Sequence, residues 1–262
     1  VNVNAPPVAD FSVTPRTGTV LTVFQLNASL SSDAEDLNSD LRYRWDVDGD
    51  TTWETPWQAD PSWVTAFDSA GNHTVRLAVR DTFGLVTEVA RNVTVDNLLP
   101  FAGFNVSPAR GNISQLFTLN ASPTFDWEDR LGALLFRWDF EGDGVWDTNW
   151  SNASTATRRY DWPGNYSPRL MVRDTSGGED ETSRRAWVEN EPPACSIGLS
   201  ADNGTVLTQF IASANCFDLE ADVAALLIRW DIEGDGTWEA GYANESVARI
   251  RYAAPGVYNI TL

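Results

Sequence analysis

The first part of the chain consists of short segments in which apolar and polar residues alternate. This pattern occurs at Ala9–Val13, Thr22–Ala28, Leu41–Trp45 and His73–Arg80, and Gly, Pro, Asn and Asp lie between these segments. Successive side chains of a β-strand point to opposite faces, so a period of two predicts strands with one buried face. No segment keeps a helical period. The sequence therefore predicts an antiparallel all-β domain.

One phrase, Arg-Trp-Asp-x-x-Gly-Asp, occurs three times. It begins at Arg44, Arg137 and Arg229, which are 93 and 92 residues apart. Solenoid repeats are usually about 20–50 residues long, so this longer period indicates tandem domains. The tryptophan of each phrase is expected to fill the core between two sheets, as in immunoglobulin-like sandwiches. These tryptophans are Trp45, Trp138 and Trp230.

The repeat positions divide the chain into the end of an upstream repeat and three domains: residues 1–4, 5–97, 98–190 and 191–262. Val1–Asn4 matches the closing strands of the first two repeats, and Leu262 aligns with Leu170. We therefore expect a window onto a longer array whose domains form an extended rod, with the third domain incomplete at its C-terminal end. In the other interpretation the chain is a polymer subunit, and its open third domain takes a strand from a neighbouring copy.

A second motif follows each phrase downstream. It reads Gly71–Asp81 in the first repeat, Pro163–Tyr166 with Leu170–Asp174 in the second, and Pro255–Leu262 in the third. The two motifs in this order resemble the polycystic kidney disease (PKD) domain family, apart from one residue inserted before Gly-Asp. The resemblance implies tandem immunoglobulin-like β-sandwiches that are extracellular and non-catalytic. Such domains occur in surface proteins, adhesins and the stalks of secreted hydrolases.

The chain is strongly acidic. It carries 37 Asp and Glu against 18 basic residues, all of them arginine, for a net charge of −19. The phosphates of nucleic acid would be repelled by such a surface, which excludes nucleic acid as a partner. The absence of lysine fits a salt-rich habitat or a biased genome, and the acidity also suits a protein that collects divalent cations. No stretch approaches the roughly 20 apolar residues of a membrane span.

The two cysteines, Cys195 and Cys216, lie near the start of one predicted strand and the end of the next. If these strands pair antiparallel, the cysteines are neighbours and can form a disulfide, which indicates an oxidising compartment. The alternative is two buried free thiols.

Acceptor sites for N-linked glycans are frequent, since 12 of 18 asparagines stand in Asn-x-Ser/Thr. This excess predicts a glycoprotein of the cell surface, although Asn, Ser and Thr also crowd loops and outer strand faces. The sites are Asn27, Asn72, Asn92, Asn105, Asn112, Asn120, Asn149, Asn152, Asn165, Asn203, Asn244 and Asn259.

The inserted residue gives each repeated phrase the spacing of a calcium-binding loop, with oxygens at alternate positions of a tight turn. The expected ligands are Asp46, Asp48, Asp50 and Glu54; Asp139, Glu141, Asp143 and Asp147; and Asp231, Glu233, Asp235 and Glu239. The usual bidentate glutamate is absent, because aromatic residues (Trp57, Trp150 and Tyr242) occupy its position. In the alternative interpretation this is an acidic turn whose first aspartate bonds to backbone amides.

A second acidic set is expected where the connectors enter the domains, because an immunoglobulin-like topology brings three loops together there. Its members are Asp33, Glu35 and Asp81; Asp126, Glu128 and Asp174; and Asp218 and Glu220. Converging carboxylates repel one another unless a cation neutralises them. Calcium there would stiffen connectors that proline already restricts. The alternative is a solvated acidic rim with flexible joints.

Other chemistry has weaker support. His73 is the only histidine and has no metal-binding or catalytic partner, and paired acids that recur in every copy argue against a glycosidase. Of the twelve tryptophans, Trp53, Trp146 and Trp238 are expected to cover the next strand. Five others break the repeat and are candidates for sugar contact: Trp63, Trp127, Trp150, Trp162 and Trp187.

Taken together, the sequence predicts a non-catalytic structural or adhesive segment of a surface protein or filament. Its partners would be neighbouring repeats, copies of the same protein, or surface glycans. The competing hypotheses are the spacer stalk of a secreted protease or glycosidase and a carbohydrate-binding module, which Trp150 or Trp162 would serve.

Overall fold

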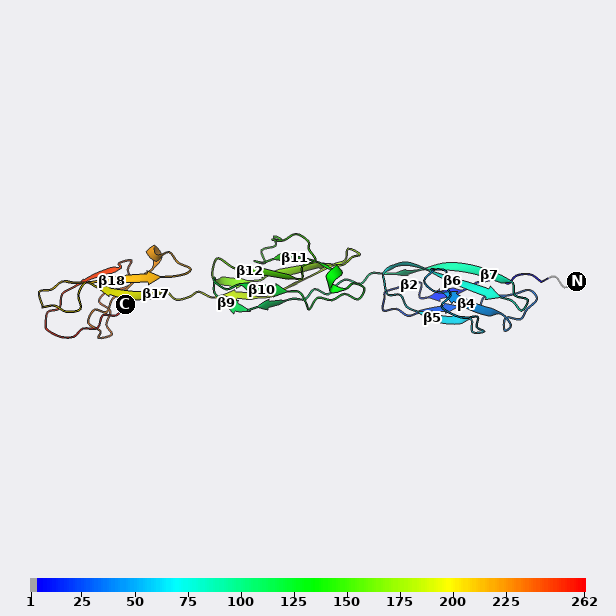
Figure 1. Cartoon of the computed structure of the whole chain (residues 1–262), viewed down its shortest axis with the longest axis horizontal. Coiled ribbons are helices and arrows are strands. Elements are labelled where there is room, and N and C mark those ends of the chain that lie inside the picture. Colours follow the sequence, from blue (N-terminus) through cyan, green and yellow to red (C-terminus); the bar gives the residue numbers. More distant parts are fainter. Residues whose placement is uncertain (1–3) are drawn as a thin grey trace. The chain divides into compact units, whose positions relative to one another are not determined.

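Strands make up nearly all of the regular structure in residues 4–262, which are the residues that this computed structural model describes (Figure 1). The chain divides into two compact units. Residues 1–105, 120–156 and 169–184 form the first unit, and residues 106–119, 157–168 and 185–262 form the second. No helix among the described residues is long and apolar enough to cross a membrane.

The first repeat lies wholly in the first unit and contains two sheets. One has the order β1-β3-β5, with β1 (Ser12–Thr14), β3 (Phe24–Asn27) and β5 (Ser62–Thr65). The other has the order β2-β7-β6-β4, with β2 (Thr17–Gly18), β7 (Val86–Val95), β6 (Gly71–Arg80) and β4 (Arg42–Asp46). All pairs are antiparallel except β2 with β7.

Side chains from both sheets share one core, so the first repeat is a sandwich. Phe24 and Leu26 of β3 and Trp45 and Leu77 of the other sheet are fully buried. Phe11 meets Trp45 edge to face, with ring centroids 5.2 Å apart. The prediction that Trp45 fills the core is confirmed.

The first unit also contains the sheet of the second repeat that carries the repeated phrase. Its order is β11-β14-β15, formed by β11 (Leu135–Asp139), β14 (Arg169–Arg173) and β15 (Glu179–Ser183). A short 3₁₀ helix, η1 (Leu131–Ala133), precedes β11. Phe104 and Trp138 are buried edge to face at 5.2 Å, which repeats the Phe11–Trp45 pair. A further sheet of the second repeat has the order β12-β10-β8, with β12 (Thr155–Arg158), β10 (Phe117–Asn120) and β8 (Asn105–Ser107). Most of its residues are assigned to the second unit.

The second unit contains a sheet of the second repeat in the order β13-β16-β9. The central strand β16 (Ala186–Val188) runs antiparallel to β13 (Gly164–Tyr166) and parallel to β9 (Arg110–Gly111). Ala186 and Val188 are buried with Phe117 and Tyr160. The strand β16 therefore supplies both hydrogen bonds and apolar side chains to this part of the fold.

The third repeat lies wholly in the second unit. Its strands β17 (Ala194–Leu199), β18 (Phe210–Phe217) and β19 (Val247–Ile250) form an antiparallel sheet in that order, and η2 (Val223–Ala225) is a short 3₁₀ helix. Trp230 is 9% exposed and packs with Ala212 and Ile250.

The all-β, tandem-domain prediction is confirmed by these sheets. The rod arrangement and the domain boundaries stay predictions. The assignment of Val1–Asn4 to an upstream strand concerns residues 1–3, which lie outside the described residues.

The predicted disulfide is present between Cys195 and Cys216. The two residues face each other in the antiparallel register of β17 and β18, as the sequence argument required. The alternative of two free thiols is wrong.

Replacing both cysteines by alanine (C195A/C216A) is expected to lower the unfolding free energy of the third repeat by about 3 kcal/mol, because the bond restricts the unfolded loop. Both side chains are at least partly exposed, so lost packing adds little. Native-state hydrogen exchange of the β17 and β18 amides measures this quantity for one repeat. Ser196→Ala, on the same strand, is the control and should change little. A loss below about 1 kcal/mol in the double variant would contradict the prediction.

Candidate functional site

The turn after β4 is wound around a buried aspartate. Asp46 is fully buried. Its carboxylate accepts hydrogen bonds from the amides of Gly49 at 2.7 Å and Thr51 at 3.1 Å. The guanidinium of Arg76 donates a third at 3.2 Å. Burial of a charged group is costly unless it is paired and hydrogen bonded, and these three donors meet that requirement.

The same turn occurs in the other two repeats. In each, the buried first aspartate accepts the amides of two glycines at 2.7 and 2.9 Å: Gly142 and Gly144 for Asp139, and Gly234 and Gly236 for Asp231. These glycines have φ between 72° and 92°, a left-handed conformation that glycine adopts without strain. Thr51, with φ 77°, adopts it in the first repeat.

The third repeat lacks the arginine of this turn. Arg169 pairs with Asp139 at 3.4 Å as Arg76 does with Asp46, but Thr261 takes the equivalent position in the third repeat. Burial opposes the charge of Asp231, yet hydrogen bonds from backbone amides outweigh it and hold the pKa of Asp231 below its ordinary value. Backbone donors alone therefore keep this aspartate ionised.

The predicted loop ligands come together in the first repeat and partly in the second. Oxygens of Asp46, Asp48, Asp50 and Glu54 lie within 4.8 Å of one another, and so do those of Asp139, Glu141 and Asp147. Asp143 is outside the second group. Among the described residues of the third repeat, Asp231, Glu233, Asp235 and Glu239 form no such group.

Most of these loop carboxylates already bind backbone amides. Glu54 accepts the Val47 amide at 2.6 Å. Its equivalents in the second and third repeats, Asp147 and Glu239, accept the corresponding amides at 2.7 and 3.0 Å. Asp50 accepts the amide of Thr52 at 2.6 Å. This is the hydrogen bonding of a self-supporting acidic turn, and a cation would have to share these oxygens. Calcium in the loops stays a prediction.

The connector set has a different arrangement in the second repeat. Asn97 Nδ2 donates to Asp174 Oδ2 at 2.7 Å, and the Leu98 amide donates to Glu128 Oε1 at 3.0 Å. Asp126 Oδ1 accepts the Glu128 amide at 2.8 Å. The remaining oxygens, Asp126 Oδ2 and Glu128 Oε2, are buried and have no hydrogen-bond partner among the described residues. Two acidic oxygens thus lie out of solvent without a donor.

The electrostatics of this pair are unfavourable. Burial raises the pKa of Glu128, and the adjacent Asp126 carboxylate raises it further, while the hydrogen bond from the Leu98 amide acts in the opposite direction. Neighbouring carboxylates disfavour each other's charged forms. The charged form of Glu128 is therefore disfavoured in the folded chain.

The first repeat has the same arrangement at its own connector. Asn4 Nδ2 donates to Asp81 Oδ2 at 2.7 Å, and the Ala5 amide donates to Glu35 Oε2 at 3.3 Å. Asn4 Oδ1 and Asp33 Oδ2 are buried and have no partner among the described residues. Burial opposes the charge of Asp81, but hydrogen bonds from Asn4 and from backbone amides hold the pKa of Asp81 below its usual range.

The third repeat keeps part of the arrangement. The Glu191 amide donates to Glu220 Oε1 at 3.3 Å, and Asp218 Oδ1 accepts the Glu220 amide at 2.8 Å. Within residues 4–262 the second oxygen of Glu220, Oε2, is buried without a partner. All three connectors therefore place an unpaired buried carboxylate oxygen beside the entering chain.

Sequence reasoning missed an alternating stack of arginine and tryptophan on the first repeat. Arg44 lies between Trp53 at 4.1 Å and Trp57 at 4.5 Å, measured from guanidinium carbon to ring centroid. Arg76 lies 5.5 Å from Trp53, and Arg80 lies 4.5 Å from Trp57. The signal was available, because each of these positions recurs at the period of the repeated phrase. We call this set the cation–π ladder.

The ladder recurs in the second repeat and is shorter in the third. Its members are Arg169, Trp146, Arg137, Trp150 and Arg173 in the second, and Trp238, Arg229 and Tyr242 in the third. Trp57, Trp150 and Tyr242, which stand where a calcium loop has its glutamate, are therefore rungs of the ladder. Trp150 carries two guanidinium groups over its ring.

Other aromatic residues remain exposed. Trp127 and Trp162 are 58% and 66% exposed, and Arg110 lies 4.3 Å from the ring of Trp187. Phe101, Phe125 and Trp127 form a continuous surface cluster, with centroid distances of 5.4 and 5.9 Å.

His73 stacks on Phe67 at 4.2 Å and bonds to the Ser69 carbonyl at 2.8 Å.

Eleven of the twelve glycan acceptor sites have an exposed asparagine, and Asn112 is half-buried. Three of them also stabilise local turns, because Asn27, Asn112 and Asn120 accept the amide two residues ahead at 2.8 to 3.0 Å. Asn112 Nδ2, the atom to which a glycan would attach, donates to Glu191 Oε1 at 2.6 Å. Local hydrogen bonding therefore accounts for part of the excess.

The repeated sandwich, its core tryptophan and its acidic turn define a class of tandem all-β domains. The family model for the PKD domain matches residues 4–95 and 105–188, so the chain belongs to the PKD domain family. No curated protein matches it.

Solved structures show similar domains. The PKD1 domain of Vibrio anguillarum Epp is 23% identical, with a TM-score of 0.28 over 36% of this chain and 98% of that one. The PKD1 domain of the Vibrio cholerae metalloprotease PrtV is 24% identical, with a TM-score of 0.27 over 36% of this chain and 100% of that one. A tetra-tandem repeat from the extending region of a large adhesion protein is 15% identical, with a TM-score of 0.39 over 96% and 66%.

Trp57→Ala should destabilise the first repeat, because it removes two cation–π contacts worth about 0.5–1 kcal/mol each and the packing of the ring. We expect a loss of about 1–2 kcal/mol, measured by hydrogen exchange of the β4 and β6 amides. Trp63→Ala is the matched control, since Trp63 is 37% exposed on β5 and no arginine of the described residues lies over its ring. Equal losses in the two variants would show that the ladder contributes nothing.

Proposed function

We propose that this chain is a non-catalytic structural or adhesive segment of an extracellular protein, in which calcium bound at the connectors fixes each connector to the domain that follows it. Membership of the PKD family, the disulfide and the exposed glycan acceptor sites support the extracellular setting. The observation that carries the proposal is the pair of buried, unpaired carboxylate oxygens on Asp126 and Glu128.

The chemistry of the connector set suits a hard cation. Calcium takes six to eight oxygen ligands from carboxylates, amide carbonyls and water. In the second repeat two such oxygens, Asp126 Oδ2 and Glu128 Oε2, are buried without a donor among the described residues. Asp126, Glu128 and Asp174 do not bring three oxygens within 4.8 Å of one another, so an ion there would draw further ligands from backbone carbonyls or water. Burial and the neighbouring Asp126 raise the pKa of Glu128. A cation bound beside Glu128 would act in the opposite direction and favour the ionised carboxylate.

The mechanical consequence follows from which residues are joined. Leu98 and Asn97 belong to the connector, whereas Glu128 and Asp174 belong to the second repeat. A cation held by these acids would add bonds between connector and domain to the two hydrogen bonds already present. The connector would then lose freedom to rotate about its backbone. In this proposal the chain acts by spacing and stiffness.

Glu128→Gln tests the site through two opposite effects. Without calcium at pH 7, the variant should be more stable than the wild type, because it removes the carboxylate whose pKa is raised by burial and by Asp126. Calcium should raise the stability of the variant less than that of the wild type, because the variant has lost one ligand. A tenfold weaker calcium affinity corresponds to about 1.4 kcal/mol. Thermal unfolding of the full chain in chelator and across a calcium titration measures both effects.

The pH dependence gives a second readout. A carboxyl whose folded pKa is raised favours folding below its unfolded pKa, and that contribution is lost as pH rises through the folded pKa. The folded pKa of Glu128 is raised, so calcium-free wild type should lose stability relative to E128Q as the pH rises above the ordinary pKa of a glutamate. Calcium should remove this difference.

Asp161→Asn is the control, because it removes one exposed charge from the same repeat. The double variant D50N/E54Q tests the loop set of the first repeat in the same titration. If calcium leaves the unfolding of the wild type unchanged, the ion proposal is wrong at both sets.

A second candidate function rests on the surface cluster of Phe101, Phe125 and Trp127. Their rings are 56%, 48% and 58% exposed and lie next to one another. Exposed aromatic rings offer apolar faces on which sugar rings can stack, and large exposed apolar patches usually mark interaction sites. Trp150 was a candidate for sugar contact from the sequence. It is less suited to stacking on a sugar, because two arginines lie over its ring.

Glycan-array binding separates this candidate from the structural proposal. Trp127→Ala should abolish any binding that the cluster supports. Trp162→Ala, which changes an even more exposed tryptophan of the same repeat, should not. Binding that survives Trp127→Ala and is lost in Trp162→Ala would move the site away from the cluster. A wild-type chain that binds no glycan would refute the candidate.

A further inference from the structure

Three arginines lie on the outer face of the first repeat without an acidic partner. Arg42 and Arg44 of β4 and Arg80 of β6 form no ion pair with any acid of residues 4–262. Arg42 and Arg80 stand directly opposite each other in the antiparallel register, and Arg44 is the next residue of β4 on the same face. Like charges at opposed positions repel each other. This face is therefore an exception in a chain whose net charge is −19.

The second repeat neutralises the equivalent position with a carboxylate. Arg173 corresponds to Arg80 at the period of the repeat, and Glu179 is its register partner. Glu179 Oε1 accepts the Nε–H of Arg173 at 2.6 Å and also pairs with Nη2. In the first repeat the register partner of Arg80 is Val86, which cannot pair with it.

The opposite side of this arginine also differs between the two repeats. Leu135 stands across from Arg173, whereas Arg42 stands across from Arg80. The first repeat thus has one arginine more and one carboxylate fewer than the second at the same place in the fold. The difference leaves a local excess of positive charge that nothing in the described chain balances.

The guanidinium groups also have unused hydrogen-bond donors. Arg42 donates Nη1 to nearby backbone carbonyls. The side chains of Arg44 and Arg80 donate no hydrogen bond to another described residue, and Nε of Arg44 is buried. Burial lowers the pKa of Arg44, Glu88 raises it, and Arg80 and Arg76 lower it further. An oxyanion beside these groups would gain charge-assisted hydrogen bonds.

The geometry of the donors suits a planar carboxylate. The guanidinium fork matches a carboxylate with two parallel hydrogen bonds, and Glu179 on Arg173 shows that a carboxylate fits beside a ring of the ladder. Trp53 and Trp57 are half-buried next to the arginines, so the face offers apolar surface beside each charge. A uronic acid combines a carboxylate with the C–H groups of a sugar ring and therefore matches both parts.

A second copy of the chain is a poorer match for this face. It would bring its own net charge of −19 against another acidic surface. Exposed charges act on one another over about 8 Å at physiological salt, so acids around the contact would oppose it. A polysaccharide in which neutral sugars separate the uronic acids presents its carboxylates without that surrounding charge.

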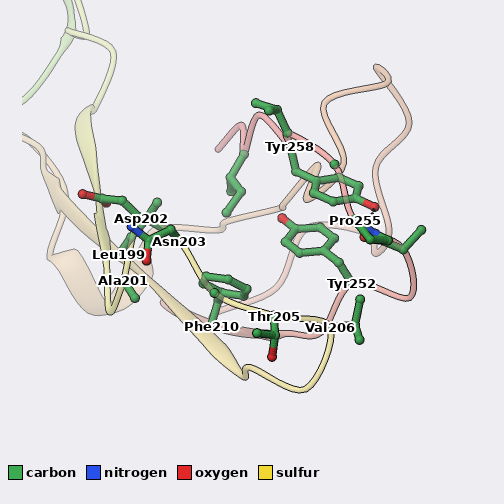
Figure 2. Close-up of a pocket in the computed structure, with 15 residues that line it drawn as sticks. Leu199, Ala201, Asp202, Asn203, Thr205, Val206, Phe210, Tyr252, Pro255 and Tyr258 are labelled. Atoms are coloured by element: carbon green, nitrogen blue, oxygen red, sulfur yellow. Dashed lines mark hydrogen bonds between the residues drawn. The ribbon is translucent and has the colours of Figure 1, made fainter.

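The pocket of the third repeat is not suited to the same ligand. Phe210, Tyr252 and Tyr258 are among its lining residues (Figure 2). No arginine lines this pocket, and its one charged lining residue is Asp202. Its aromatic rings suit a neutral ligand, whereas Asp202 would repel a carboxylate.

We propose that Arg42, Arg44 and Arg80 bind the carboxylates of a polysaccharide that contains uronic acids. Trp57 holds Arg44 and Arg80 at 4.5 Å from its ring, so both guanidinium groups are positioned before the ligand arrives and little side-chain entropy is lost on binding. The site lies within the first repeat and uses none of the connector acids. It therefore goes beyond the proposed function and does not depend on calcium.

An oligosaccharide in which glucuronate alternates with N-acetylglucosamine tests the proposal by isothermal titration of the full chain. Chelator is present, so that no cation bridges the sugar carboxylates to the acidic turns. We expect one site per chain, with an affinity that falls as salt is added. The control is the same oligosaccharide with its carboxyl groups reduced to alcohols, which should bind at least tenfold more weakly.

A matched pair of variants locates the site. Val86→Glu places a carboxylate opposite Arg80, as Glu179 is placed opposite Arg173, and should weaken binding about tenfold or more. Val86→Gln has nearly the same shape without the charge and should bind like the wild type. Val86 is 40% exposed, so neither change disturbs the core.

The second repeat offers the reverse experiment. The double variant L135R/E179V gives it the two residues that distinguish the first repeat, Arg42 and Val86. It should raise the stoichiometry from one site per chain to two.

Four results would overturn the proposal. A wild-type chain that does not bind the glucuronate oligosaccharide, or that binds its reduced form equally well, does not recognise carboxylates. Equal affinities of V86E and V86Q would place the ligand elsewhere. Self-association without added sugar that V86E abolishes would assign the face to a second copy of the chain.

Discussion

A charged side chain is buried at the same point in each repeat, directly after the core tryptophan, and much of the surrounding structure follows from satisfying it. Asp46, Asp139 and Asp231 have at most 4% of their surface exposed. Each needs donors in place of water, and the turn provides them by folding its own amides inward. That requirement sets two residues of the turn in the left-handed region, which explains the recurring glycines.

The same turn also organises the outer face of the sheet. In the first two repeats Arg76 and Arg169 bind the buried aspartate with one nitrogen and Glu88 or Glu181 with another. They are then held beside Trp53 and Trp146 and form one end of each cation–π ladder. The third repeat has threonine at this position and keeps only Arg229 between its two rings. The arginine beside Trp53 or Trp146 is therefore the same residue that pairs with the buried aspartate.

Much of the fold could be predicted because it depends on local alternation. The strands around Trp45 and the meeting of Cys195 with Cys216 follow from period-two patterns and antiparallel pairing, and the tandem domains follow from the spacing of the repeated phrase. The ladder was missed because its members come from strands and turns that meet only once the register of β4 against β6 is known. The roles of the acids could not be separated either. Asp46 and Asp126 look alike in sequence, yet Asp46 has a donor for each oxygen and Asp126 has a donor for only one.

The connector and the closing strand of a repeat are physically linked, because one runs directly into the other. Three residues after Val188 of β16, the Glu191 amide binds Glu220 of the third repeat, while its carboxylate binds Asn112 of the second. Arg110 of β9 holds Glu189 at 3.3 Å between these points. A closing strand that is paired in its sheet therefore fixes the start of the connector, and acids at the next domain can then act on a chain that is already positioned. An ion proposed at a connector should bind more weakly wherever the preceding closing strand is not in place. The free energy needed to order the connector would then have to come from ion binding alone.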